Sequence, residues 1–259
     1  MLPDLNPDID FMIQLEKDTL FSQPTEALAA FQFDESVVNV FPDMIQRSVP
    51  GYQTILAGIG ELTQQFAQPN SHLYDLGCSL GAVSLTMRRK LPKTFEEGGG
   101  KIIGVDISQP MIERAQSYIA AFQSKIPIEL YCQDIQQIPI EKASVVVMNF
   151  TLQFIAPEKR QQMLNKIYQG LNQNGILILS EKIHFEDPKI QQAIESLHLQ
   201  FKRANGYSEL EISQKRASLE NVLISDTQAT HFQRLKQAGF QSTAIWFQAY
   251  NFVSFLAIK

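Results

Sequence analysis

The stretch His-Leu-Tyr-Asp-Leu-Gly-Cys-Ser-Leu-Gly, residues 72–81, decides the fold of this chain. Its apolar start predicts a strand over 72–76, and small residues then occupy alternate positions up to Gly81, where a helical pattern begins (81–91). A small-residue turn between a strand and a helix exposes backbone N–H groups to a ligand. The stretch therefore predicts a ligand site at the end of a strand.

A second signal lies one helix and one strand further on. The run Lys-Ile-Ile-Gly-Val-Asp, residues 101–106, reads as a buried strand that ends in an acid. An acid at the end of the second strand of such a sheet accepts hydrogen bonds from ribose hydroxyls. The two signals together predict a nucleoside site at the carboxyl ends of a parallel sheet.

The spacing of the small residues separates two kinds of nucleoside ligand. A dinucleotide fingerprint requires glycine at 77, 79 and 82, and this chain has Gly77, Ser79 and Ala82. The motif acid-x-Gly-x-Gly-x-Gly, typical of class I S-adenosylmethionine (SAM) methyltransferases, is met at Asp75, Gly77 and Gly81, with Ser79 in place of the middle glycine. Serine is small enough to keep the backbone accessible. We therefore expect SAM rather than a dinucleotide.

Composition limits the alternatives. A length of 259 residues with 44% hydrophobic residues suits one α/β domain with a substantial core. A net charge of −5 argues against a broad phosphate-binding surface, so we expect no direct binding of nucleic acid. No run of 18 apolar residues and no signal peptide is evident, which predicts a cytoplasmic protein without a membrane partner.

Cysteine and histidine give no metal pattern. Cys78 and Cys132 lie far apart and outside any CxxC spacing, which favours reduced thiols over a disulfide or a metal site. The four histidines form no HExxH or similar ligand pair. We therefore expect no bound metal.

Strand and helix signals alternate through most of the chain, which predicts a doubly wound, mostly parallel sheet. A short link at 249–251 favours an antiparallel hairpin at the C-terminal end. The fold class is thus α/β, a class I methyltransferase-like (Rossmann-like) sheet of seven strands. The expected strands are 72–76, 101–106, 127–132, 144–148, 176–180, 243–248 and 252–258, and the expected helices between them are 81–91, 109–124 and 157–169.

The remaining segments predict a leader and a cap. Residues 1–18 are acidic and contain two prolines, which is typical of a flexible leader. Residues 19–259 then form one SAM-binding domain, with helical cap segments at about 19–70 and 184–240. Within the second segment, Ser208 to Glu211 reads as a capping box at a helix start.

Polar residues follow three neighbouring strands at the expected site. Asp106 is expected to bind ribose, Asp134 to accept from the adenine amino group, and Asn149 to meet the reacting end of the ligand. The alternatives are a surface acid for Asp106, a turn residue for Asp134, and a paired buried amide for Asn149.

Cations form a second cluster in the cap. Lys202 and Arg203 end one helix, and Lys215 and Arg216 lie in the next. One interpretation is that these cations lie on a solvated helix face, where nearby glutamates balance them. The other is an arginine that holds a carboxylate in a bidentate fork.

Longer stretches make the likeness specific. Four runs resemble the carboxy-S-adenosyl-L-methionine (carboxy-SAM) synthase family, and the likeness extends from about Asp18 to Lys259. They are Phe-Pro-Asp-Met-Ile-Gln-Arg-Ser-Val-Pro-Gly-Tyr (41–52), Tyr-Asp-Leu-Gly-Cys-Ser-Leu-Gly (74–81), Asn-Phe-Thr-Leu-Gln-Phe (149–154) and Phe-Lys-Arg-Ala-Asn-Gly-Tyr-Ser-Glu-Leu-Glu-Ile-Ser-Gln-Lys-Arg (201–216).

The resemblance implies an enzyme that converts SAM and prephenate to carboxy-SAM and phenylpyruvate. It also implies a homodimer, and a downstream tRNA carboxymethyltransferase that uses carboxy-SAM to modify a wobble uridine. Arg216 would hold the new carboxylate, and no general base is identified. The cofactor-binding positions implied for the rest of SAM are Tyr52, Gly77, Cys78, Ser79, Asp106, Ile107, Asp134, Ile135 and Asn149.

Two other functions remain open. One is a SAM-dependent methyltransferase of a small-molecule acceptor, which would transfer the methyl group. The other is a non-catalytic SAM-binding regulator, which would bind without prephenate-dependent turnover.

Overall fold

The computed structural model describes residues 16–24, 31–219 and 222–259. Most of the expected leader, residues 1–15, lies outside these ranges. Asp18, assigned to the end of the leader, is only 1% exposed, so the packed part of the chain begins earlier than the sequence indicated. Within the described ranges, every helix is too short or too polar to cross a membrane.

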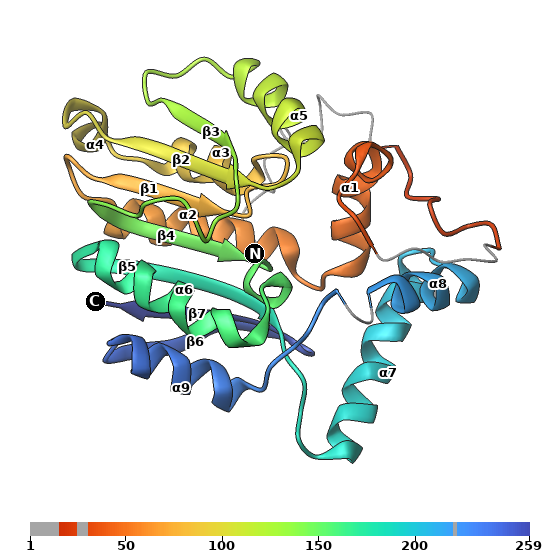
Figure 1. The fold of residues 1–259 in the computed structure, drawn as a ribbon. Helices are drawn as coiled ribbons and strands as arrows, with labels where there is room; N and C mark the ends of the chain where they lie inside the picture. Colours follow the sequence, from red (N-terminus) through yellow and green to blue (C-terminus); the bar gives the residue numbers. More distant parts are fainter. Residues whose placement is uncertain (1–15, 25–30, 220–221) are drawn as a thin grey trace, which may run out of the picture.

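Seven strands form one mixed sheet, as predicted, and their order is β3-β2-β1-β4-β5-β7-β6 (Figure 1). The first five strands are parallel, and β7 pairs antiparallel with both β5 and β6. The strands are β1 (His72–Leu76), β2 (Lys101–Asp106), β3 (Ile128–Cys132), β4 (Ala143–Asn149), β5 (Leu171–Lys182), β6 (Ser242–Ala249) and β7 (Phe252–Ile258).

Helices cover both faces of the sheet. In Figure 1, α6 and α9 lie in front of the sheet and α2 lies behind it. The helices are α1 (Glu35–Ser48), α2 (Tyr52–Phe66), α3 (Ala82–Lys90), α4 (Lys93–Glu97), α5 (Gln109–Ala120), α6 (Pro157–Gly170), α7 (Pro188–Ala204), α8 (Glu209–Leu219) and α9 (Gln228–Ala238), with a short 3-10 turn at Leu152–Phe154.

Successive side chains along the strands point to opposite faces of the sheet, and this produces two hydrophobic cores. In β4, Val146 and Met148 pack with one hydrophobic cluster, whereas Val145 and Val147 pack with another. Successive side chains of a strand point to opposite faces, so a fully apolar strand serves both layers. This arrangement leaves the carboxyl ends of β1, β2 and β4 as the place where polar side chains gather.

The segments expected to form a cap, 19–70 and 184–240, occupy two kinds of position. Helices α1, α7 and α8 lie together beyond the ends of the strands (Figure 1). Helices α2 and α9 instead belong to the layers, because their apolar residues pack into the two cores. The cap is therefore smaller than the sequence indicated.

Two element boundaries also differ from the prediction. Helix α5 ends at Ala120 rather than 124, and the Phe122 carbonyl accepts from Arg88 Nη2 at 2.9 Å instead of from a helical N–H. Strand β5 begins at Leu171 rather than 176, because a register shift lets it pair with β4 before the Asn174 turn. The capping box at Ser208 is confirmed: its N–H donates to Glu211 Oε2 at 2.7 Å.

Candidate active site

The turn after β1 has the backbone that its small residues indicated. Gly77 and Gly81 have φ of +83° and +82°, in the left-handed region that favours glycine. A Cβ on Gly77 would lie 2.3 Å from Thr151 Oγ1. Ser79, in place of the motif's middle glycine, also has a positive φ of +48°. The turn is thus held open at a backbone conformation that costs a serine some strain.

Asp75 fixes the helix that follows this turn. Its Oδ2 accepts from Ser84 N at 2.9 Å and from Ser84 Oγ at 2.7 Å, at the start of α3. Burial raises the pKa of this carboxyl to about 7, against the lowering effect of the two Ser84 hydrogen bonds. Asp75 does not line the cavity described below, so the first acid of the motif orients the helix rather than touching a ligand.

Asp106 ties the second strand to the turn. Its Oδ2 accepts from Ser79 N at 2.9 Å, and its Oδ1 accepts from Ser108 N at 2.9 Å. Burial raises the pKa of the carboxyl, which the backbone donors oppose. Each oxygen retains a lone pair, so this held carboxylate can still accept from vicinal hydroxyls.

The end of β3 offers polar and apolar contacts side by side. Asp134 Oδ1 accepts from Gln136 N at 2.8 Å, which fixes the carboxylate at the start of a turn. Ile107 is 73% exposed, whereas Ile135 is 8% exposed. An aliphatic surface next to an acid suits a flat base that carries an amino group.

The ends of β4 and of the loop before α2 supply two further groups. Asn149 Oδ1 is buried and has no hydrogen-bond partner among the described residues. Such an acceptor costs free energy unless a ligand satisfies it. Tyr52 starts α2 and is 9% exposed, and burial raises the pKa of its phenol. Burial likewise raises the pKa of the Cys78 thiol.

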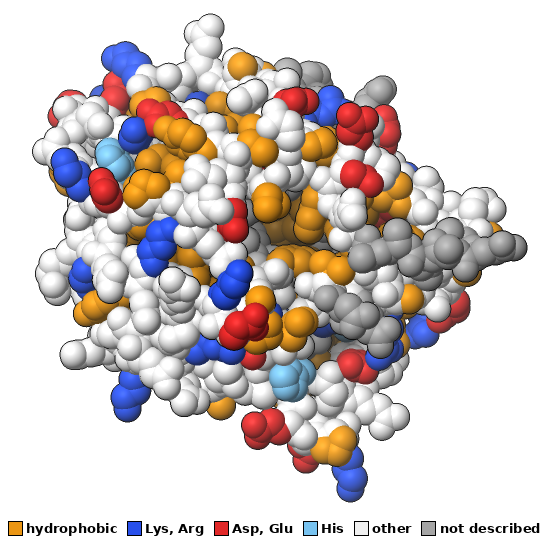
Figure 2. Space-filling view, viewed as in Figure 1, with side chains coloured by type: hydrophobic (Ala, Val, Ile, Leu, Met, Phe, Trp, Pro, Cys, Tyr) orange, Lys and Arg blue, Asp and Glu red, His pale blue; other side chains and the backbone are white. Residues whose placement is uncertain are grey.

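These residues line one cavity of about 590 Å³. Figure 2 shows a hollow near the centre of this face with hydrophobic side chains in its walls. The volume is that of a typical small-molecule site. All but one of the residues proposed for SAM line it: Tyr52, Gly77, Cys78, Ser79, Asp106, Ile107, Asp134, Ile135 and Asn149.

Arg216 is the exception. It lies on α8, does not line the cavity, and its side chain is 71% exposed. Its Nη2 lies 3.9 Å from Glu195 Oε2 on α7. Burial is the main cause that lowers the pKa of Lys182 and of Lys202, and the charge of Arg216 adds a smaller effect, so Arg216 acts electrostatically on these two cavity lysines.

The sequence missed two groups at that end. Lys182, at the last position of β5, and His198, on α7, line the cavity with Lys202 and Lys215. Lys182 carries the same signal that identified Asp106 and Asn149, a polar residue at the end of a buried strand. His198 lies four residues before Lys202 on one helix, a spacing that puts both on one face.

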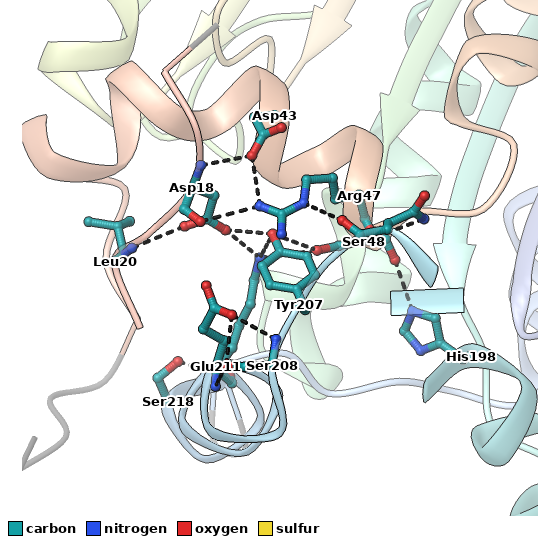
Figure 3. Close-up of polar contacts among 12 residues, drawn as sticks. Asp18, Leu20, Asp43, Arg47, Ser48, His198, Tyr207, Ser208, Glu211 and Ser218 are labelled. Atoms are coloured by element: carbon teal, nitrogen blue, oxygen red, sulfur yellow. Dashed lines mark hydrogen bonds and ion pairs between the residues drawn. The ribbon is translucent and has the colours of Figure 1, made fainter. Parts of the chain in front are cut away.

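A buried polar cluster supports this end of the cavity from behind. Figure 3 shows Asp18, Arg47 and Tyr207 turned toward one another. Tyr207 donates to Asp18 Oδ2 at 2.5 Å, and the guanidinium carbon of Arg47 lies 3.9 Å from the centroid of the Tyr207 ring. Lys215 Nζ donates to Ser48 Oγ at 3.1 Å and lies 3.5 Å from Asp18 Oδ2. The cluster joins the start of the described chain to α1 and α8.

Metal ligands are not grouped in the part of the chain that the structure describes. No set of three or more His, Cys, Asp and Glu side chains there has a geometry that could hold a metal ion. Cys78 and Cys132 are both free thiols.

Solved structures share the fold at low sequence identity. Human N-acetylserotonin methyltransferase in complex with SAM aligns with a TM-score of 0.59 and 19% identity, over 95% of this chain and 63% of that one. Magnesium protoporphyrin IX methyltransferase from Synechocystis PCC 6803, with bound SAH, aligns with a TM-score of 0.57 and 15% identity, over 83% and 87% of the two chains. These likenesses confirm a methyltransferase fold.

Sequence relatives are far closer. The family described as "Methyltransferase domain" matches residues 73–175. The carboxy-S-adenosyl-L-methionine synthase of Hydrogenovibrio crunogenus is 71% identical over 95% of this chain and 96% of its own. The synthase of Pasteurella multocida is 55% identical over 95% of this chain and 100% of its own. The chain therefore belongs to the carboxy-S-adenosyl-L-methionine synthase family, whose members are built on the class I methyltransferase fold.

Proposed function

We propose that this protein converts SAM and prephenate to carboxy-SAM and phenylpyruvate. The observation that carries the proposal is the 71% identity with a carboxy-SAM synthase over 95% of the chain. Identity at this level, over nearly the full length of both proteins, covers the cavity as well as the scaffold.

The cavity supports a specific pose for SAM. The turn at Gly77 and Ser79, whose N–H groups already donate within the protein, lets the methionine tail lie close to the backbone, and Asp106 accepts from the ribose hydroxyls. Asp134 accepts from the adenine amino group beside Ile107 and Ile135. Tyr52 and Asn149 then flank the sulfonium end.

The reaction needs a site that excludes water and holds its reactants together. A sulfonium makes its methyl C–H acidic. When prephenate loses CO2 and becomes aromatic it expels its ring hydroxide, which takes the methyl proton and leaves as water, while the methyl carbon bonds to the CO2. Free CO2 would escape faster than it reacts, so the two substrates must lie in contact. The apolar walls of the cavity, with Phe33, Phe150 and Phe154 among them, serve that purpose.

Arg216 is proposed to hold the new carboxylate. The proposal rests on the match of 201–216 to the family, and the charge of Arg216 acts on the cation end of the cavity. Because the side chain is 71% exposed and lies 3.9 Å from Glu195, it has to leave that acid to reach the ligand.

Three wider statements belong to the same proposal. The protein forms a homodimer, it works in the cytoplasm, and its product supplies a downstream tRNA carboxymethyltransferase that modifies a wobble uridine. It does not itself need to bind RNA, in keeping with its net charge of −5.

The test is the mass of the ligand released from purified protein. A species heavier than SAM by one carboxyl group supports the proposal. Unmodified SAM, together with methyl transfer to an acceptor in a product screen, would favour an ordinary methyltransferase. Binding of SAM with no turnover in the presence of prephenate would favour a regulator.

A further inference from the structure

Three lysines line the cap end of the cavity and two arginines lie on the neighbouring helices α7 and α8, and three of these five cations have acid partners. Arg203 pairs with Glu209 on the surface, and Arg216 lies beside Glu195. Lys215 is buried, with Asp18 at 3.5 Å and with hydroxyl partners. These three positive charges are balanced by the protein itself.

Lys182 and Lys202 are different. Both line the cavity, and neither Nζ has an ion pair or hydrogen bond within residues 16–24, 31–219 and 222–259. Burial lowers the pKa of Lys182, and burial together with the charges of Lys215, Lys182 and Arg216 lowers the pKa of Lys202 to about 7. Glu195 opposes the lowering at Lys182, but among the described residues no carboxylate lies within ion-pair distance of either Nζ. The two ammonium groups therefore repel each other and are relieved by an anion.

Their position connects them to the reacting end of SAM. Lys182 lies two residues beyond Ser180, and Ser180 pairs with Asn149 across β4 and β5. The Asn149 Oδ1 is the buried acceptor without a partner. Lys182 therefore lies near the site proposed for the sulfonium, and Lys202 lines the same cavity.

Taken with the proposed function, on which this step rests, the geometry points to Lys182 and Lys202 as the residues that bind the carboxylates of the second substrate, a small dianion. Two unbalanced cations fit two carboxylates. His198, which lines the same end, does not add a third charge, because burial lowers its pKa to about 3 and its Nε2 lies 2.8 Å from the Ser48 carbonyl.

The test replaces each lysine by an uncharged side chain of similar length. In Lys182→Met and Lys202→Met we expect the KM for prephenate to rise about 10- to 100-fold, the range for losing a hydrogen bond to a charged group. The Kd for SAM should stay within about twofold in both. Lys202→Arg, which keeps the charge, should recover most of the loss. Lys189→Met is the matched control, because Lys189 is an exposed lysine of α7 away from the cavity.

A second measurement separates binding from folding and from turnover. With S-adenosylhomocysteine bound, prephenate is titrated calorimetrically in two buffers of different ionisation enthalpy. The charges that act on Lys202 are those of Lys215 and Arg216 on α8 and of Lys182 on β5, and His198 lies four residues before it on α7. A dianion raises the low pKa of Lys202, so wild-type protein should take up protons near pH 7.5, and folded Lys202→Met should take up fewer.

The outcomes distinguish this inference from the proposed function. Normal turnover with an unchanged KM for prephenate in both variants would overturn the lysine pair and leave the function intact. No turnover by wild-type protein, with prephenate binding that both variants lose, would keep the dianion site and remove the function. Prephenate binding that is equal in wild-type and variant proteins, with equal proton uptake, would also overturn the pair.

Discussion

The two ends of the cavity are built in opposite ways. At the nucleoside end, the Asp106 carboxylate already accepts two backbone hydrogen bonds, at 2.9 Å each, before any ligand arrives. At the cation end, neither Lys182 Nζ nor Lys202 Nζ has a hydrogen bond or ion pair among the described residues, and burial lowers the pKa of both lysines. The first end is organised by the fold itself. The second holds charges that only a ligand balances, and we expect it to lower stability when empty.

Gly77→Ala should have the largest effect, at the organised end. The new Cβ meets Thr151 at 2.3 Å on a backbone with φ of +83°, so we expect the free energy of unfolding to fall by about 2–4 kcal/mol. Urea unfolding measures it. Gly99→Ala is the matched control: φ is +69° there, but nothing lies within 4 Å of the new Cβ. Equal losses in the two variants would show that the close approach to Thr151 does not matter.

Asp106→Ala should weaken the binding of SAM, whereas a substitution at the cation end should not. Loss of two charge-assisted hydrogen bonds to ribose is expected to weaken SAM about 100-fold, or about 3 kcal/mol. Calorimetric titration of SAM gives the Kd, and Lys182→Met supplies the opposite case, with SAM affinity kept. A Kd for SAM within threefold of the wild-type value would remove Asp106 from the ribose site.

Lys202→Met should reveal the stability cost of the cation end. The folded pKa of Lys202, about 7, lies below its ordinary value of 10.5, so the charged lysine destabilises the fold fully below pH 7. That penalty disappears as pH rises from about 7 to 10.5. The variant without ligand should therefore melt above wild-type protein at pH 6.5, and the difference should shrink toward pH 10. A difference that is constant with pH, or that favours wild-type protein at pH 6.5, would contradict this account.

Ser79→Gly should have the smallest effect. Glycine relieves a positive φ of +48° but gives up the contact of Ser79 Oγ with Met111 Sδ at 3.4 Å. We expect the free energy of unfolding to change by less than about 1 kcal/mol and SAM affinity by less than about twofold. The same unfolding and titration experiments measure both. A large loss of SAM affinity would show that the serine hydroxyl itself binds the ligand.

The nucleoside end could be predicted because its signals are local. The turn of residues 77–81 and the acid after β2 lie within a few residues of the strands that position them, and the mostly parallel sheet follows from β–α alternation. Nine of the ten residues expected to bind the cofactor line one cavity, and Arg216 is the exception.

The cation end depends on contacts that are distant in sequence. Asp18 balances Lys215 across 197 residues, and no local pattern reveals that pairing. Without it, the four cations at 202–216 look equivalent. The family resemblance selected Arg216, whose side chain is 71% exposed and lies beside Glu195. Lys182 could have been found, because it follows a buried strand as Asp106 does.

The most direct test follows a labelled carbon from prephenate to the carboxyl group of carboxy-SAM. The protein is incubated with SAM and with prephenate that carries 13C in its ring carboxylate, and the products are analysed by mass spectrometry. The account predicts carboxy-SAM with the heavy carbon in the new carboxyl group, together with unlabelled phenylpyruvate. Unchanged SAM, or carboxy-SAM without the label, would contradict it.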